Sequence, residues 1–115
     1  MENIKRIHLM SEAEIEELYS LPDFSTNEQR LYFTLNEFKR IALNRYSNTK
    51  TRVYFILQLG YFKAKQQFFS FDFNDVFDDT QFILGTYYNG TELASSGRIS
   101  RVSAQIQKQD ILRRA

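Results

Sequence analysis

The sequence predicts an all-α fold, and three observations lead to this prediction. The 115 residues include only four glycines and one proline, which is little material for the many tight turns of an all-β domain. A hydroxyl residue followed three positions later by glutamate, a pattern typical of helix starts, occurs three times within residues 11–37. A long apolar segment follows. We therefore expect one domain, residues 1–115, of five or six helices around a central helix at about 51–65.

The first helix is expected to begin at Ser11, in the sequence Ser-Glu-Ala-Glu. The serine hydroxyl and the glutamate carboxylate can each satisfy a free amide of the first turn. Ile15, Leu18 and Tyr19 follow at helical spacing, and Pro22 ends the helix.

The second and third helices are predicted by the same capping pattern. Residues 25–28 (Ser-Thr-Asn-Glu) precede a short helix with Leu31 and Tyr32. Residues 34–37 (Thr-Leu-Asn-Glu) open a helix whose apolar side chains are Leu35, Phe38, Ile41 and Ala42.

The fourth helix is the most apolar one and is expected to begin at Thr49 or Thr51. Its aliphatic and aromatic side chains leave little polar surface, so we expect the other helices to surround it. Glycine costs about 1 kcal/mol relative to alanine inside a helix, so Gly60 predicts close packing by a neighbouring backbone. The basic residues of this helix lie at its two ends: Lys50, Arg52, Lys63 and Lys65.

A buried connector and a fifth helix come next. Residues 68–75 alternate apolar and polar side chains, but no comparable second strand exists to pair with them, so we expect an extended connector. The fifth helix is expected to be capped by Asp78 or Asp79 and to end at Gly90.

The last helix is expected to begin near Ile99, with Val102 and Ile106 on its apolar side, and to run through Leu112. No capping residue closes it. We therefore expect the chain to be part of a longer protein.

Charge is strongly segregated along a chain whose formal net charge is only +1. Residues 1–37 carry eight acids and three bases, residues 38–71 carry seven bases and no acid, and residues 72–79 carry four aspartates. Residues 98–115 are basic again, with five bases and one acid. Two interpretations stay open. The acidic first helix could neutralise the basic block, or the bases could form one face for a polyanion.

Several classes of site lack the residues they need. The absence of cysteine excludes a disulfide framework and a thiolate zinc site, and the scattered glycines form no nucleotide-binding loop. The single histidine, His8, is expected to be a surface residue. Asp75, Asp78 and Asp79 lack the further oxygen ligands of a calcium loop. We therefore expect no metal and no cofactor.

The chain also lacks the signals of a membrane or exported protein. Its longest apolar run is the five residues from Val53 to Leu57, whereas a membrane helix needs about 20. The amino terminus has no apolar core of a signal peptide. A cytoplasmic protein without membrane contact is expected.

Two stretches of the sequence, residues 9–35 and 51–69, carry a resemblance to a known family. Their most specific parts are Leu-Pro-Asp-Phe at 21–24, Tyr-Phe-Thr-Leu at 32–35, and Arg52 with Leu-Gln-Leu-Gly-Tyr-Phe at 57–62. The chain resembles, over nearly its whole length, the amino-terminal domain of Tn-three-family transposases, large bacterial enzymes that move replicative transposons. The resemblance implies a helical region that contributes to recognition of the terminal inverted repeats. It places the catalytic acidic triad downstream of this chain, so no enzymatic activity is expected here.

The polar members of the resembling motifs have two interpretations each. Arg52 could contact DNA or pair with an acid of the first helix, and Gln58 could contact DNA or cap a buried backbone group. The apolar members are expected to be core. The sequence departs from the family at residues 64–68, which lack a glycine before the aromatic, and the segment 68–79 is divergent.

We expect a DNA-binding module of a transposase, whose partners are double-stranded transposon ends and the rest of the transposase chain. Helices at about 80–88 and 98–112 could form a helix-turn-helix-like pair, with the last helix in a major groove. The alternative is a protein–protein module that positions or dimerises the transposase, as in a homodimer. The expected DNA contacts are Arg98, Arg101, Gln105 and Lys108 on the last helix, and Arg45, Lys50, Arg52, Lys63 and Lys65 on the DNA backbone.

Overall fold

The structure, a computed structural model, describes residues 11–46, 48–91, 93 and 99–114 of the chain. These residues form helices and connecting segments, with no β-strand among them, and this confirms the all-α prediction. The helices are α2 (Glu12–Tyr19), α3 (Thr26–Phe33), α4 (Glu37–Leu43), α5 (Thr49–Lys65), α6 (Phe77–Tyr87) and α7 (Arg101–Arg114).

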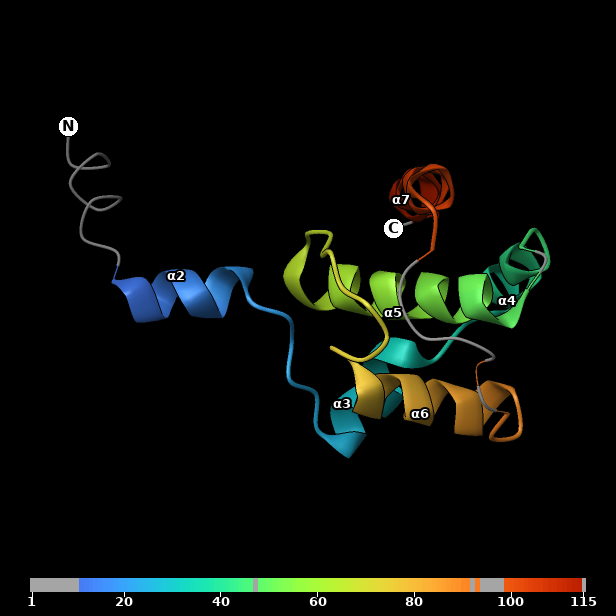
Figure 1. Cartoon of the computed structure of the whole chain (residues 1–115), viewed down its shortest axis with the longest axis horizontal. Helices are drawn as coiled ribbons and strands as arrows, with labels where there is room; N and C mark the ends of the chain where they lie inside the picture. The colour runs from blue at the N-terminus through green and yellow to red at the C-terminus, as the bar shows by residue number, and fades with distance from the viewer. Residues whose placement is uncertain (1–10, 47, 92, 94–98, 115) are drawn as a thin grey trace.

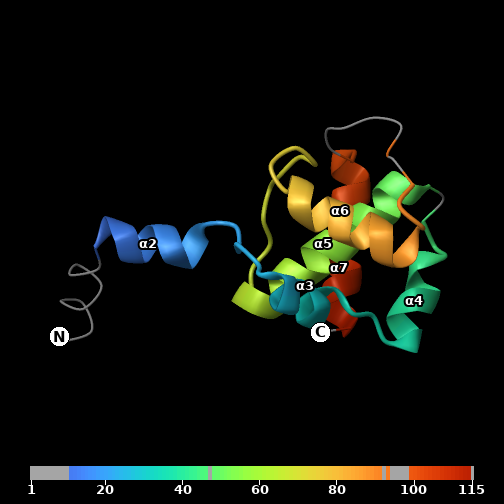
Figure 2. The same ribbon diagram turned by 90° about the horizontal axis from the view of Figure 1, so that it is seen from below.

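Helix α5 is the centre of the molecule, as predicted. Helices α3 and α6 pack on one side of it, and α7 crosses its opposite side (Figure 1). Figure 2 shows the same order from below, with α6 in front of α5 and α7 behind it. Helix α2 extends away from this body (Figure 1). The residues from Val53 to Tyr61 are all buried, because α5 has neighbours around most of its circumference.

The three short motifs on which the family resemblance rests (residues 21–24, 32–35 and 57–62) come together in an aromatic cluster where α3 contacts α5. The ring of Phe24, which precedes α3, stacks on Tyr32 with centroids 4.8 Å apart, and it meets Phe33 edge-on at 5.4 Å. Phe33 in turn contacts Tyr61 of α5 edge-on at 5.9 Å. Aromatic pairs in these geometries contribute about 0.5–1.5 kcal/mol beyond their burial. The apolar members of the motifs therefore form the core, as expected.

Gly60 of α5 lies against the end of α3. A Cβ built on Gly60 would lie 2.4 Å from one ring atom of Phe33 and 3.2 Å from the carbonyl oxygen of Tyr32. The close packing predicted for this glycine is therefore present, but the nearest neighbour is an aromatic ring and not backbone.

The segment between α5 and α6 is a partly buried connector without strand structure, as predicted, but only in part extended, because residues 73–76 form a turn. The side-chain amide of Gln58, 1% exposed, donates to the carbonyl of Phe69 and accepts from the Phe69 amide, both at 2.9 Å. The side chains of Phe71 and Phe73 enter the core, and Phe71 stacks on Tyr54 at 4.6 Å. Gln58 thus caps buried backbone groups, which is one of the two roles that the sequence left open for it.

The capping predictions hold for the first two helices. The Ser11 hydroxyl accepts from the Glu14 amide, and Ser25 and Glu28 form a complete reciprocal capping box. Helix α5 starts at Thr49 because Asn48 caps it and accepts from the Thr51 amide at 2.8 Å.

The third capping prediction was wrong. Asn36, and not Thr34, caps α4, by accepting from the Lys39 amide at 2.9 Å. The Thr34 hydroxyl donates instead to the Arg30 carbonyl at the end of α3. The expected apolar face of α4 was also wrong in part. Phe38 and Ile41 are exposed, because this short helix reaches the core only through its last residues, Ala42 and Leu43.

The start of α6 also differs from the prediction. Its N-cap position is Val76, which provides no side-chain hydrogen bond. Asp78 lies in the first turn and is exposed, whereas Asp79 is buried and bonded to other helices. The helix ends at Tyr87 with Tyr88 as its C-cap, two residues before the predicted cap at Gly90. Gly90 has a positive φ of 74° and its amide donates to the Leu84 carbonyl.

The two helical glycines generate a paired prediction about stability. Gly60→Ala should lower the free energy of unfolding by about 2 kcal/mol, because overpacking against the buried Phe33 ring outweighs the gain in helix propensity. Gly85→Ala, on the exposed side of α6 with no atom within 4 Å of the new Cβ, should raise it by about 0.5–1 kcal/mol. Urea unfolding followed by circular dichroism measures both. A stabilised Gly60→Ala variant would contradict the close contact.

Candidate nucleic-acid interface

Helix α7 docks on the body through polar side chains. The Gln107 amide nitrogen donates to the Thr51 carbonyl at 2.9 Å. Asp110, 3% exposed, accepts from the guanidinium of Arg45 at 3.1 Å and from the hydroxyl of Tyr46 at 3.0 Å. Ile111 is the one fully buried apolar side chain of the described part of α7. These contacts fix both the position and the rotation of the helix.

This rotation is opposite to the predicted one. Val102, Ile106 and Leu112, which we call the α7 stripe, are 71%, 54% and 58% exposed. The prediction of a buried apolar side was therefore wrong for Val102 and Ile106. The physical reason is that Asp110 and Gln107 have specific partners on α5 and on the segment before it, and only one side of the helix can face the body.

Three predicted DNA contacts lie together along one groove. Arg101, Gln105 and Lys108 of α7 line a groove of about 370 Å³, and Ser70 of the connector lies on its other side. The ammonium of Lys108 also lies 5.9 Å from the centroid of the Phe68 ring. The walls of the groove are completed by Tyr54, Phe69, Ile99 and Ala104. The fourth residue predicted on this helix, Arg98, lies outside the described residues, as does His8.

The other predicted basic residues do not join this groove. Arg45 is paired with Asp110, and the Nε of Arg52 donates to the Tyr46 carbonyl at 2.8 Å. Arg52 thus holds the end of the loop before α5. Lys50 lies half-buried at the start of α5, and Lys65 lies at its opposite end.

Lys63 is bound to the end of α3. Its ammonium lies 3.5 Å from the carbonyl oxygens of Tyr32 and Thr34, where a helix carboxyl end attracts a cation. Burial lowers the pKa of Lys63, and the charge of the neighbouring Lys39 lowers it further. This lysine is therefore engaged within the protein.

The expected helix-turn-helix-like pair is absent from the described residues. Helices α6 and α7 lie on opposite sides of α5 (Figures 1 and 2), and residues 88–100 separate them, whereas a helix-turn-helix joins its helices by three or four residues. Neutralisation of the basic block by the first helix is not the main arrangement either. The carboxylates of Glu12, Glu14 and Glu16 are exposed on α2, which extends away from the body.

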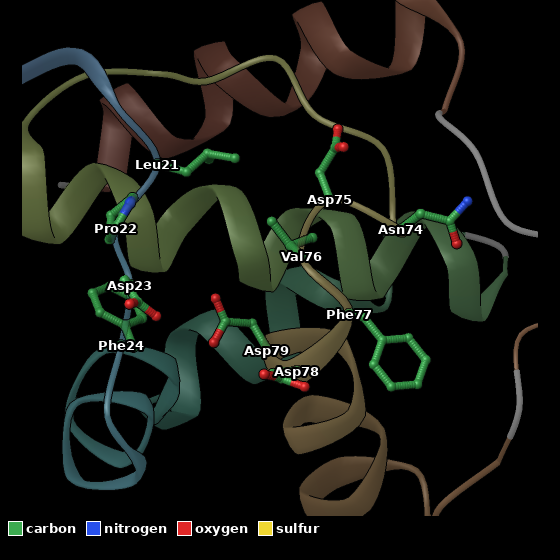
Figure 3. Close-up of a pocket in the computed structure, with 10 residues that line it drawn as sticks. All are labelled: Leu21, Pro22, Asp23, Phe24, Asn74, Asp75, Val76, Phe77, Asp78 and Asp79. Atoms are coloured by element: carbon green, nitrogen blue, oxygen red, sulfur yellow. The ribbon is translucent and has the colours of Figure 1, made fainter. Parts of the chain in front are cut away.

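A second pocket has the opposite charge. Four aspartates line a pocket of about 300 Å³ between the segment before α3 and the start of α6 (Figure 3). Three of them are close together in the sequence, whereas Asp23 lies about 50 positions earlier and was not predicted to join them. Across the described part of the chain, no group of three or more acidic, histidine or cysteine residues could hold a metal ion. A pocket of this charge repels a polyanion. The aspartates are Asp23, Asp75, Asp78 and Asp79.

Asp79 connects three helices from within this pocket. It accepts from the side-chain amide of Gln29 on α3 at 2.8 Å and from the hydroxyl of Tyr61 on α5 at 2.5 Å. Burial raises the pKa of Asp79, and the two hydrogen bonds oppose this effect. The charges of Asp78 and Asp23 raise the pKa further.

The raised pKa of Asp79 predicts the direction of a pH effect. The folded protein binds this proton more tightly than an unfolded chain, whose carboxyl has a pKa near 3.8. The resulting stabilisation is complete below that value and is lost as the pH rises through the folded-state pKa. Relative to Asp79→Asn, the wild-type free energy of unfolding should therefore increase as the pH falls from 7 towards 4.

Urea unfolding at several pH values measures this difference. Glu37→Gln, which removes an exposed carboxylate, is the matched control. If the free energies of unfolding of the wild type and of Asp79→Asn change with pH in parallel, the idea of a costly buried charge at Asp79 is contradicted.

Comparison with known proteins identifies the family of the chain. Neither the curated proteins nor the solved structures include one that matches it. No helix within the described residues is long and apolar enough to cross a membrane. A family model described as a domain of unknown function, DUF4158, matches residues 9–114, and the chain therefore belongs to the DUF4158 family.

Proposed function

We propose that this domain binds double-stranded DNA as part of a transposase and contributes to recognition of the terminal inverted repeats of a transposon. The observation that carries the proposal is the convergence of Arg101, Gln105 and Lys108 on one groove beside the exposed helix α7. The resemblance of residues 9–35 and 51–69 to the amino-terminal domain of Tn-three-family transposases supports the same function. Catalysis belongs to another part of such a transposase, which acts in the cytoplasm.

The groove suits contact with the DNA backbone. Arg101, which is exposed, and Lys108, which lies over the Phe68 ring, supply two cations, and Gln105 and Ser70 add hydrogen-bonding groups to the same groove. Cations that neutralise phosphates release counterions, so binding should weaken as salt rises. The amide of Gln105 can also bond a base edge.

The anchoring of α7 supports this role as well. Asp110 and Gln107 fix the helix from the inner side, so its outer side keeps a constant orientation towards a duplex. A B-DNA major groove, about 12 Å wide, admits an exposed helix of this kind. The acidic pocket lined by Asp23, Asp75, Asp78 and Asp79 would disfavour approach of DNA at that surface.

A titration with labelled DNA tests the proposal. Two contacted phosphates predict a loss of affinity of about tenfold between 50 and 200 mM salt. Arg101→Glu combined with Lys108→Glu should abolish binding of a terminal-repeat duplex, while the far-ultraviolet circular dichroism stays unchanged. Arg30→Glu combined with Arg40→Glu makes the same change in net charge at exposed positions on α3 and α4, and should retain most of the affinity.

Two results would contradict the proposal. Unaltered binding by the folded Arg101→Glu, Lys108→Glu variant would reject the groove as the surface. Negligible affinity for both terminal-repeat and unrelated duplexes at 50 mM salt would reject DNA binding by this domain.

The second candidate function is a protein–protein module that positions the transposase without touching DNA. The observation in its favour is the α7 stripe, since three large apolar side chains on one exposed helix are typical of a protein-binding surface.

A further inference from the structure

Helix α7 carries an apolar surface that nothing in the described chain covers. Val102 and Ile106 of the α7 stripe, together with Gln105 and Gln109, line a shallow groove of about 460 Å³. Arg101 lines one end of it. The surface combines an apolar centre with basic and amide groups around it, which is the composition of a site for an amphipathic helix of opposite charge.

Helix α2 is an amphipathic helix of that charge. Its apolar residues Ile15 and Tyr19 are 43% and 62% exposed. Their spacing places them on one side of the helix with Glu12 and Glu16. Isolated helices shorter than about 12–15 residues are marginal in water. The eight residues of α2 therefore need a packing partner for this side.

The two helices are complementary in charge. Residues 12–19 contain four glutamates and no base, whereas residues 101–114 contain four bases and a single acid, Asp110. Since Asp110 is buried and paired with Arg45, the outer side of α7 is purely basic.

The geometry of the segment after α2 favours a partner in another molecule. Ser20 is extended (φ −75°, ψ 155°), and Pro22 restricts Leu21 to extended conformations as well. Phe24 is fixed by its stacking on Tyr32. The chain therefore directs α2 away from its own α7, as Figure 1 shows, and towards the surroundings of the molecule.

We propose that α2 of one copy packs on the α7 stripe of a second copy, in a reciprocal dimer. Ile15 and Tyr19 cover Val102 and Ile106, while the glutamates of α2 lie towards Arg101 at the end of the same groove. Because the dimer is two-fold symmetric, this contact forms twice, and α2 of each copy covers α7 of the other. This proposal does not rest on DNA binding.

The molar mass of the full chain, measured by sedimentation over a concentration series, tests the proposal. The wild type should reach the mass of a dimer. Val102→Ser combined with Ile106→Ser should halve the observed mass. Leu31→Ser, which changes an apolar side chain of α3 that is 67% exposed, is the matched control and should stay dimeric.

Charge reversal provides the sharper experiment. Glu12→Lys combined with Glu16→Lys should give a monomer, and so should Arg101→Glu combined with Arg113→Glu, because Arg113 is exposed and its spacing places it on the side of α7 that carries Val102 and Ile106. An equimolar mixture of these two variants should recover the dimer mass, because both contacts are then between opposite charges. Recovery in the mixture also shows that neither variant failed to fold.

Several outcomes would overturn the proposal. These are a wild type that stays monomeric at all concentrations, charge variants that keep the dimer mass, or a mixture that stays monomeric. Protection of Ile15 and Tyr19 within a monomer would show that α2 packs on its own chain instead. The Val102→Ser, Ile106→Ser variant keeps the net charge and the residues of the basic groove, so its affinity for DNA reports on the proposed function separately.

Discussion

The pair of hydrogen bonds between Gln58 and the backbone of Phe69 is the contact on which the connector and the groove both depend. A buried amide side chain satisfies the donor and the acceptor of one residue in a segment that has no strand partner. Unsatisfied, these two backbone groups would cost about 1–3 kcal/mol each. With Phe69 fixed, the alternation of the segment directs Phe71 inward and leaves Ser70 exposed at the groove. A core contact thus sets the side of the groove opposite α7.

The pairing of buried polar groups also bears on the orientation of α7. The hydrophobic effect alone would bury Val102 and Ile106, but the observed rotation brings Asp110 to Arg45 and Tyr46 and the Gln107 amide nitrogen to the Thr51 carbonyl. A buried carboxylate without Arg45 and Tyr46 would be costly, whereas an exposed valine costs comparatively little. The partners of Asp110 and the burial of Ile111 therefore set which side of α7 faces outward, even though the side-chain oxygen of Gln107 is buried on the inner side without a hydrogen-bond partner. It also leaves the basic groove and the α7 stripe on the outer side of the molecule.

Sequence reasoning predicted what depends on neighbours in the chain and missed what depends on distant ones. The caps at Ser11 and Ser25 and the buried run of α5 follow from local spacing, and they were predicted correctly. Asp79 was assigned to capping because its partners, Gln29 and Tyr61, lie far away in sequence. Periodicity also counts apolar residues without regard to polar partners, which is why the buried side of α7 was wrong.

The candidate site likewise combines features that follow from neighbours in the chain with features that depend on distant residues. Arg101, Gln105 and Lys108 share one helix, so their spacing already places them together. The engagement of Arg45 by a carboxylate 65 positions away could not be read from the sequence. Nor could the contact of Lys63 with the end of α3, which depends on tertiary packing.

The attachment of α7 by a few polar contacts and one fully buried isoleucine has a consequence for how the molecule opens. Local opening requires less energy where little apolar surface is buried. We therefore expect backbone amides of α7 to exchange with deuterated solvent sooner than those of the enclosed α5. The carboxyl-terminal helix can separate while the aromatic cluster stays intact.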